Sequence, residues 1–125
     1  MPEVRYLKAV NQALYDAMEV DDSVFVIGED VAAAGGPFKA TRGLLETFGP
    51  GRVYDAPIAE AVIAGVAVGA AMTGMRPVAE IMFMDFITLA MDQIVNQAAK
   101  ARSMFGGQAS LPLVIRAPHG GGLNA

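Results

Sequence analysis

Glu60 is the residue of this chain best placed to do chemistry, because it is a carboxylate at the start of an otherwise uncharged segment. Residues 61–72 are all apolar or glycine, which predicts a helix buried on every side. Burying a carboxylate there costs free energy unless something pairs with it or binds it. A structural alternative is that Glu60 interacts favourably with the backbone N–H groups of the first helical turn.

Helical and strand patterns alternate along the rest of the chain. Apolar residues recur at helical spacing from Leu7 to Met18, which predicts a first amphipathic helix at 7–19. Further helices are predicted at 41–48, 60–74 and 86–103, and strands at 23–28, 52–55, 77–84 and 111–116. This alternation is typical of an α/β fold in which a parallel sheet is flanked by helices.

Polar or aromatic residues follow each predicted strand. They are Glu29 and Asp30, Glu60, Asp85 and Phe86, and His119. Because the carboxyl ends of parallel strands meet at one edge of a sheet, we expect these residues to lie together. Open α/β sheets bind their ligands at that edge, so the pattern predicts a ligand site and strengthens the functional reading of Glu60.

Composition excludes several classes of protein. The 125 residues contain no cysteine, so neither a disulfide framework nor a cysteine-based zinc site is possible. The net charge is −4 without a basic stripe, which argues against nucleic-acid binding. The first residues lack the pattern of a signal peptide, and the longest apolar run is too short to span a membrane. A bacterial-type cytoplasmic protein is therefore the expectation, and 54% hydrophobic residues favour burial against a partner subunit.

Two local motifs are explained without assigning them a catalytic or membrane role. The loop 119–122, His-Gly-Gly-Gly, matches the oxyanion loop of some esterases, but no serine of the chain lies in the Gly-x-Ser-x-Gly context that such enzymes need. The spacing of Gly65 and Gly69 is interpreted as close approach between buried helices or subunits. His119, without neighbouring ligands, is a poor metal candidate.

A series of ordered motifs resembles a known family. The motifs are VIGEDV at 26–31, TRGL at 41–44, RVYDAPIAE at 52–60, RPVAE at 76–80, DF at 85–86, DQIVNQAAK at 92–100, GG at 106–107 and PLVIRAP at 112–118. Together they resemble the beta subunit of the thiamine-diphosphate-dependent first component of 2-oxoacid dehydrogenase complexes, which includes pyruvate, branched-chain 2-oxoacid and acetoin enzymes. The resemblance covers the whole chain. It implies that residues 1–125 are the N-terminal part of a pyrimidine-binding domain, with a transketolase-type C-terminal domain outside this chain.

The resemblance also implies roles for individual residues. Glu60 matches the glutamate that hydrogen-bonds ring nitrogen N1′ of the cofactor, so that the 4′-amino group can take a proton from the thiazolium ring. Phe86 matches the aromatic residue that stacks on the pyrimidine, with Met82 and Ile58 completing an apolar slot. Leu113 matches a position whose backbone carbonyl helps to bind a potassium ion in relatives. The acidic residues Glu29 and Asp92 match positions that line a passage between paired active sites, although both could equally be ordinary solvated carboxylates.

In that family the alpha subunit holds Mg²⁺ and the diphosphate. The present chain has no Gly-Asp-Gly motif, so we expect it to contribute half of a site within an alpha2beta2 heterotetramer that serves a lipoyl transacylase core. The 125 residues alone are expected to be inactive. Two other interpretations stay open: a catalytically silent structural or interaction fragment, and another thiamine-dependent enzyme related to transketolase. The 2-oxoacid or acetoin substrate is not determined by these motifs.

Overall fold

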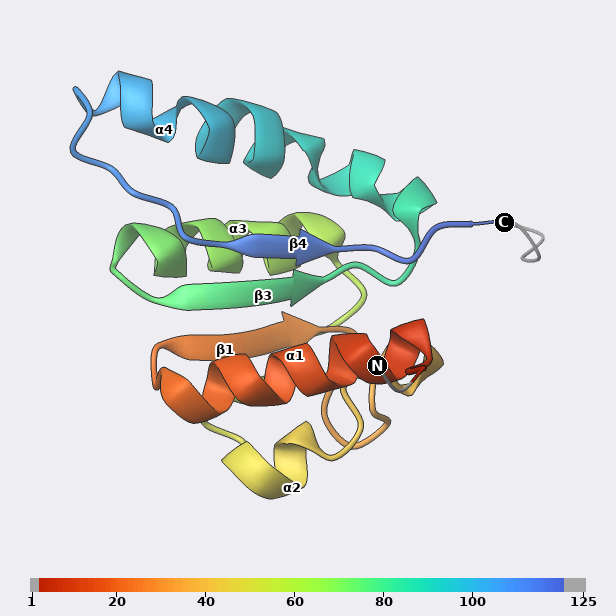
Figure 1. Ribbon diagram of the computed structural model, residues 1–125. Coiled ribbons are helices and arrows are strands. Elements are labelled where there is room, and N and C mark those ends of the chain that lie inside the picture. Colours follow the sequence, from red (N-terminus) through yellow and green to blue (C-terminus); the bar gives the residue numbers. More distant parts are fainter. Residues whose placement is uncertain (1–2, 121–125) are drawn as a thin grey trace.

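The computed structural model describes residues 3–120 and contains one four-stranded sheet with the order β2-β1-β3-β4 (Figure 1). Its strands are β1 (Val24–Gly28), β2 (Val53–Asp55), β3 (Arg76–Glu80) and β4 (Val114–Arg116). Every neighbouring pair is parallel, as the alternation of helices and strands predicted. The carboxyl ends of all four strands consequently lie at one edge, hereafter the carboxyl edge, and their beginnings form the amino edge.

One face of the sheet is covered by α1 (Tyr6–Val20) and α2 (Leu44–Phe48). Successive strand residues point to opposite faces, so Val24 and Val26 of β1 and Val53 of β2 pack on this side with Leu14 and Met18 of α1. The 3-10 helix η1 (Pro37–Lys39) lies in the long connection after β1.

The opposite face is covered by α3 (Glu60–Met72). Its residues Ile63 and Ala67 pack against Phe25 and Ile27 of β1 and Ala79 of β3. The segment 84–104 forms an outer layer, in which η2 and η3 contact α3 (Figure 1). Glu60 is thus the first residue of a helix that lies directly on the sheet.

Two sequence-based predictions about the segment 77–103 were wrong in part. The single helix expected at 86–103 consists of a 3-10 helix, η2 (Met84–Ala90), a π-helix, η3 (Asp92–Ala98), and a short α-helix, α4 (Ala99–Met104). The strand expected at 77–84 ends at Glu80, because the chain turns into η2. In the described part of the chain no helix is both long and apolar enough to cross a membrane.

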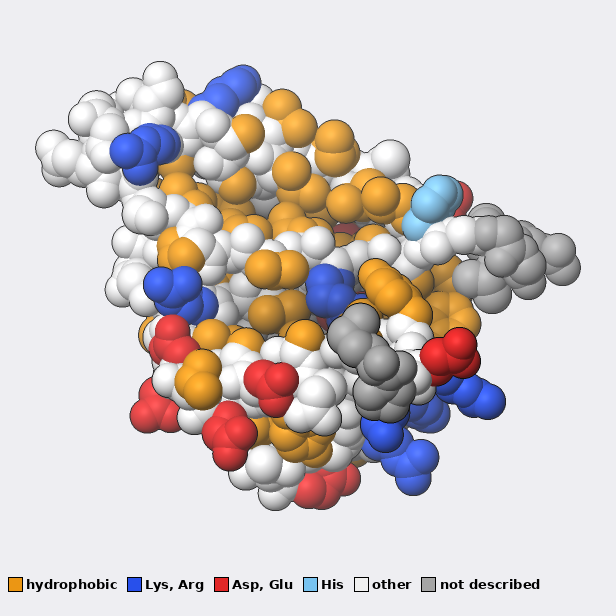
Figure 2. Space-filling model, in the orientation of Figure 1, with side chains coloured by type: hydrophobic (Ala, Val, Ile, Leu, Met, Phe, Trp, Pro, Cys, Tyr) orange, Lys and Arg blue, Asp and Glu red, His pale blue; other side chains and the backbone are white. Residues whose placement is uncertain are grey.

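The expected burial of α3 on every side was also wrong for this chain. Ile63, Ala64 and Ala67 are buried, but Val62 is 53% exposed and Val66 is 45% exposed. The sheet covers one side of the helix and the η2–η3 layer covers part of another, and nothing in the described chain covers the remainder. Hydrophobic side chains also remain visible over β4 and along the outer layer (Figure 2).

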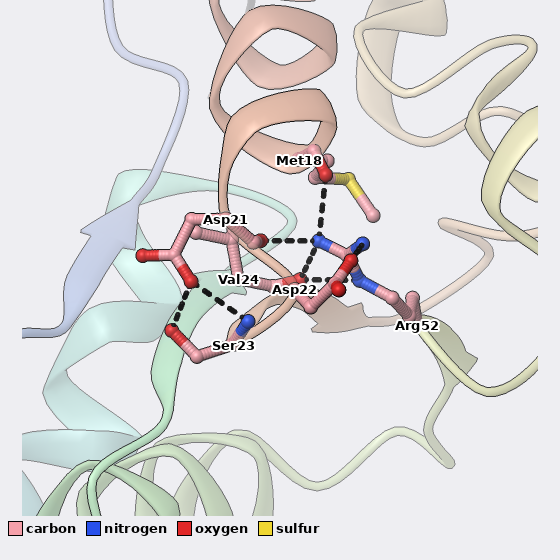
Figure 3. A network of polar contacts seen from close by, with 6 residues as sticks. All are labelled: Met18, Asp21, Asp22, Ser23, Val24 and Arg52. Atoms are coloured by element: carbon pink, nitrogen blue, oxygen red, sulfur yellow. Dashed lines mark hydrogen bonds and ion pairs between the residues drawn. The ribbon is translucent and has the colours of Figure 1, made fainter.

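Arg52 ties the end of α1 to the amino edge of the sheet (Figure 3). Its guanidinium group donates hydrogen bonds to the carbonyl oxygens of Met18 at 2.9 Å, Asp21 at 2.7 Å and Val24 at 2.6 Å. It also forms an ion pair with Asp22 at 3.2 Å and lies 5.5 Å from the ring centroid of Phe48. Hydrogen bonds from a charged donor are stronger than neutral ones, so this group fixes how α1 leads into β1.

Candidate functional site

Glu60 lies at the carboxyl edge with its side chain buried, at 6% exposure. Ala59, the residue before it, accepts the first backbone bonds of α3 through its carbonyl oxygen, from Val62 at 2.9 Å and Ile63 at 3.0 Å. Within residues 3–120 the Glu60 carboxyl takes part in no side-chain hydrogen bond and in none of the ion pairs. The structural alternative is therefore reduced to the favourable interaction of this charge with the helix dipole, because Glu60 lies in the first turn of α3.

Glu29 provides a second carboxyl group beside Glu60. It follows β1 directly, and its Oε1 atom is buried without a hydrogen-bond partner among the described residues. Burial raises the pKa of Glu29 above the ordinary value, and the negative charges of Glu60 and Asp30 raise it further. The influence of Glu60 places the two carboxyl groups within electrostatic reach of each other, and the buried Oε1 does not fit a fully solvated carboxylate.

An apolar surface lies near these acids on the segment that follows β3. Phe86, in η2, is 41% exposed rather than in the core, and its ring meets Phe83 edge-on at a centroid distance of 5.8 Å. Met82 is half-buried, whereas Ile58, just before α3, is 85% exposed. Because η2 packs against α3, an exposed aromatic residue and the unpaired carboxyl of Glu60 stand on contacting elements.

Three other residues that the sequence analysis singled out have different surroundings. Leu113 immediately precedes β4 and so lies toward the strand's beginning, away from the carboxyl edge. Asp92 is exposed in η3, where it accepts a hydrogen bond from Asn96 at 2.8 Å. His119 lines a cavity to which Glu60 does not contribute. Of the loop 119–122, only His119 and Gly120 belong to the described residues, and across those residues no group of three or more His, Asp or Glu side chains could hold a metal ion.

Sequence reasoning missed Glu80 and Arg116 as site residues. They end β3 and β4 and are paired in register, with Arg116 Nη1 2.5 Å from Glu80 Oε2. Burial raises the pKa of Glu80 to about 7, although the charge of Arg116 opposes the shift. One signal was available: each residue is the charged end of an apolar strand. Their pairing depends on the strand order, which the sequence patterns did not specify.

Glu80 and Arg116 border a cavity of about 860 Å³ on the face of the sheet that α1 covers. Tyr6, Leu7 and Val10 of α1 line one side of it, and His119 lies at the exit of β4. The cavity therefore adjoins the carboxyl edge from the face opposite α3, and Glu60 and Phe86 are not among its lining residues.

Comparison with known proteins shows which family this chain resembles. The family model described as transketolase, pyrimidine binding domain, matches residues 2–125. The chain is 53% identical over 124 residues to a 2-oxoisovalerate dehydrogenase subunit beta from Bacillus subtilis, covering 99% of this chain and 38% of that protein. It is 46% identical over 125 residues to a pyruvate dehydrogenase E1 component subunit beta from Acholeplasma laidlawii, covering 100% and 38%. An acetoin:2,6-dichlorophenolindophenol oxidoreductase subunit beta from Bacillus subtilis is 46% identical over 129 residues, covering 94% and 38%. The chain thus spans little more than a third of the length of these relatives.

Proposed function

Because the chain belongs to the transketolase pyrimidine-binding domain family, we propose that it binds the aminopyrimidine ring of thiamine diphosphate within the beta subunit of a 2-oxoacid dehydrogenase. The observation that carries the proposal is Glu60, a residue only 6% exposed at the carboxyl edge, whose carboxyl group forms no ion pair in the described chain. Relatives bearing the names of such subunits match nearly the whole chain.

The residues present fit a flat, polar aromatic ring. The Glu60 carboxyl is free to hydrogen-bond a ring nitrogen, and a buried bond of that kind is strong because little water competes for it. Phe86 offers an exposed aromatic face for stacking, which adds to the free energy of apolar burial. Ile58 and Met82 would supply apolar contacts at the rim of the ring. The carboxyl edge would therefore bind the pyrimidine and exclude water from its bond with Glu60.

The proposed chemistry divides between cofactor and protein. When bound, thiamine diphosphate supplies the thiazolium ring that accepts electrons during decarboxylation of a 2-oxoacid. Glu60 would hold a proton at the ring nitrogen N1′, a general acid–base role. Glu29 would keep a second proton-binding group nearby, because its pKa is raised. The acyl group would then pass to a lipoyl domain of the complex.

The remaining parts of the site would come from elsewhere. We propose that an alpha subunit binds the diphosphate and Mg²⁺, in an alpha2beta2 heterotetramer attached to a lipoyl transacylase core. The uncovered apolar residues Val62 and Val66 of α3 and Leu89 of η2 support burial against another subunit or another part of the protein. A potassium ion held in part by the Leu113 carbonyl remains a proposal from the resemblance alone.

Reconstitution of the full-length protein with its alpha partner tests the function. Decarboxylation of pyruvate and of a branched-chain 2-oxoacid, and oxidative cleavage of acetoin, would each be followed with an artificial electron acceptor, with and without thiamine diphosphate and Mg²⁺. We expect turnover of at least one substrate that depends on the cofactor. A folded complex that binds no thiamine diphosphate would contradict the proposal and favour a structural role. Cofactor-dependent transfer between sugar phosphates would instead favour a transketolase-like enzyme.

A further inference from the structure

Glu80 and Arg116 form a charged pair at the carboxyl edge, although Glu80 lies in the interior. The Glu80 side chain is 2% exposed and that of Arg116 is 26% exposed. Taking such a pair out of water costs free energy, and the attraction between the charges often does no more than offset this cost. The pair therefore adds little to the stability of the fold, and its role is better sought in the backbone segments that it holds together.

The pair belongs to a set of contacts that fasten the exit of β3 to the exit of β4. The backbone N–H of Ile81 donates to the carbonyl oxygen of Arg116 at 2.8 Å, and that of Met84 donates to Pro118 at 3.1 Å. Together with the 2.5 Å bond between the Glu80 and Arg116 side chains, these bonds join residues 80–84 to residues 116–118.

Glu80 is also held from the β1 side. A Cβ atom placed on Gly28 would lie 2.7 Å from the Glu80 carbonyl oxygen and 2.8 Å from the Glu80 Cβ. Only glycine permits so close an approach of the two strands. The end of β3 is thus confined between β1, which leads into Glu29, and β4. Residues 80–84 carry Met82 and continue directly into η2 with Phe86.

We propose that the Glu80–Arg116 pair is a positioning device, which fixes the exit of β3 so that Met82 and Phe86 stay aligned with the pyrimidine-binding carboxyl of Glu60. This inference rests on the proposed function. Neither Glu80 nor Arg116 touches the cofactor in this account. Both act through the backbone of residues 80–84, and the short charge-assisted bond between their side chains sets where that backbone lies.

Protonation of Glu80 provides a way to loosen the pair without mutation. Because burial raises the pKa of this carboxyl to about 7, it is largely ionised at pH 8 and largely protonated at pH 6. A protonated carboxyl makes a weaker bond to the guanidinium group. The other titratable groups that line the same cavity are Tyr6 of α1, Arg116 of β4 and His119 beyond it, and all three remain unchanged in a Glu80→Gln variant.

Titration of the full-length alpha–beta complex with thiamine diphosphate and Mg²⁺, by calorimetry at pH 8 and pH 6, tests the inference. Glu80→Gln should weaken binding about fivefold at pH 8, the scale of one ordinary hydrogen bond. The difference from the wild type should shrink below about twofold at pH 6, since the wild-type carboxyl is then protonated. Arg116→Met removes the donor and leaves the buried Glu80 carboxylate without its partner, so it should weaken binding by at least about tenfold at pH 8.

Arg76→Gln is the matched control, because Arg76 begins the same strand and forms a half-exposed ion pair with Asp21 at 3.2 Å. Its cofactor affinity should stay within about twofold of the wild type, as expected for an exposed pair. Unchanged affinity at pH 8 in Glu80→Gln or in Arg116→Met would overturn the positioning role while leaving the proposed function intact. A wild-type complex that binds no cofactor would overturn both.

Discussion

At the amino edge of the sheet, the Arg52 guanidinium donates to three backbone carbonyl oxygens and pairs with Asp22, while Asp21 accepts hydrogen bonds from Ser23. At the carboxyl edge, Glu29 Oε1 is buried without a partner and Glu60 is buried without an ion pair in the described chain. Both ends belong to the same four strands, so strand composition alone does not explain the difference.

The contrast separates a structural end of the sheet from the end that we propose binds the cofactor, hereafter the binding end. Buried polar groups in folded proteins are nearly always hydrogen-bonded, and each exception calls for an explanation. Among the described residues the amino edge follows this rule, whereas the carboxyl edge breaks it at Glu29 Oε1, beside a Glu60 carboxyl that forms no ion pair. A ligand with hydrogen-bonding groups could bind both carboxyl groups, which agrees with the general position of ligand sites in open α/β sheets.

The largest effect is expected from Glu60→Gln, which changes the binding end alone. In the full-length complex, turnover should fall at least about 10²-fold, because a general acid–base group is lost. The free energy of unfolding should not fall, since no ion pair is removed. Steady-state assay with an artificial electron acceptor and urea denaturation measure the two quantities. Retention of more than half of the wild-type rate would remove Glu60 from the mechanism.

Arg52→Met should produce the opposite pattern at the structural end. Loss of its hydrogen bonds leaves the carbonyl oxygens of Met18, Asp21 and Val24 short of a donor, so unfolding free energy should fall by about 2–3 kcal/mol. Cofactor affinity should stay within about twofold, the usual outcome for a distant, independent site. Urea denaturation and calorimetric titration of the same preparation supply both values. Asp22→Asn is the control, because Asp22 is fully exposed and its loss should leave stability unchanged.

Phe86→Ala should weaken thiamine diphosphate binding by about 1–3 kcal/mol through loss of stacking and buried area. Stability should change little, because Phe86 is already 41% exposed. Phe105→Ala, a change at a comparably exposed phenylalanine beyond α4, controls for a general effect of removing an aromatic ring. Equal cofactor affinity in the wild type and in Phe86→Ala would show that Phe86 does not contact the ring.

A smaller effect is expected in the pH dependence of the unfolding free energy, which should have opposite signs for acids at the two ends. Burial and neighbouring charges raise the pKa of Glu29 above 4.5, so the folded state binds this proton more tightly than the unfolded state. Its ionisation therefore lowers stability as pH rises from about 4.5 through the raised pKa. Glu29→Gln should be more stable than the wild type at pH 7, with the gain disappearing near pH 4. Urea denaturation across this range measures the difference.

Asp21→Asn is the matched control at the amino edge, with the opposite sign. Hydrogen bonds from Ser23 lower the pKa of Asp21 below 3.8, so its ionised form stabilises the fold above that value and the contribution is lost as pH falls through the lowered pKa. Asp21→Asn should be less stable than the wild type at pH 7, and the deficit should shrink in acid. If Glu29→Gln behaved like Asp21→Asn, the distinction between the two ends would not hold.

The parallel sheet and the burial of Glu60 were predictable because they depend on local patterns. Apolar runs alternating with helical segments predicted the parallel sheet, and an uncharged run after a single carboxylate predicted that Glu60 is buried. Both expectations agree with the structure. The convergence of Glu29, Glu60 and Phe86 at one edge follows from strand direction alone.

Features that depend on which strands are neighbours, or on what packs over a helix, were not predictable from the sequence. The Glu80–Arg116 pair requires β3 and β4 to be adjacent and in register, and neither fact is visible in either strand by itself. The exposure of Val62 and Val66 depends on what packs outside α3, which an apolar sequence cannot report. The separation of 84–104 into 3-10, π and α segments likewise reflects how this layer packs rather than its propensity.

A crystal structure of the full-length alpha–beta complex with thiamine diphosphate tests the central claim most directly. We expect the pyrimidine nitrogen N1′ at hydrogen-bonding distance from a Glu60 carboxyl oxygen, about 2.6–3.2 Å, with the Phe86 ring stacked on the pyrimidine. Glu29 should lie next to this pair without contacting the diphosphate. A cofactor bound elsewhere, with the Glu60 carboxyl engaged by another protein group, would contradict the assignment of the carboxyl edge as the binding end of the sheet.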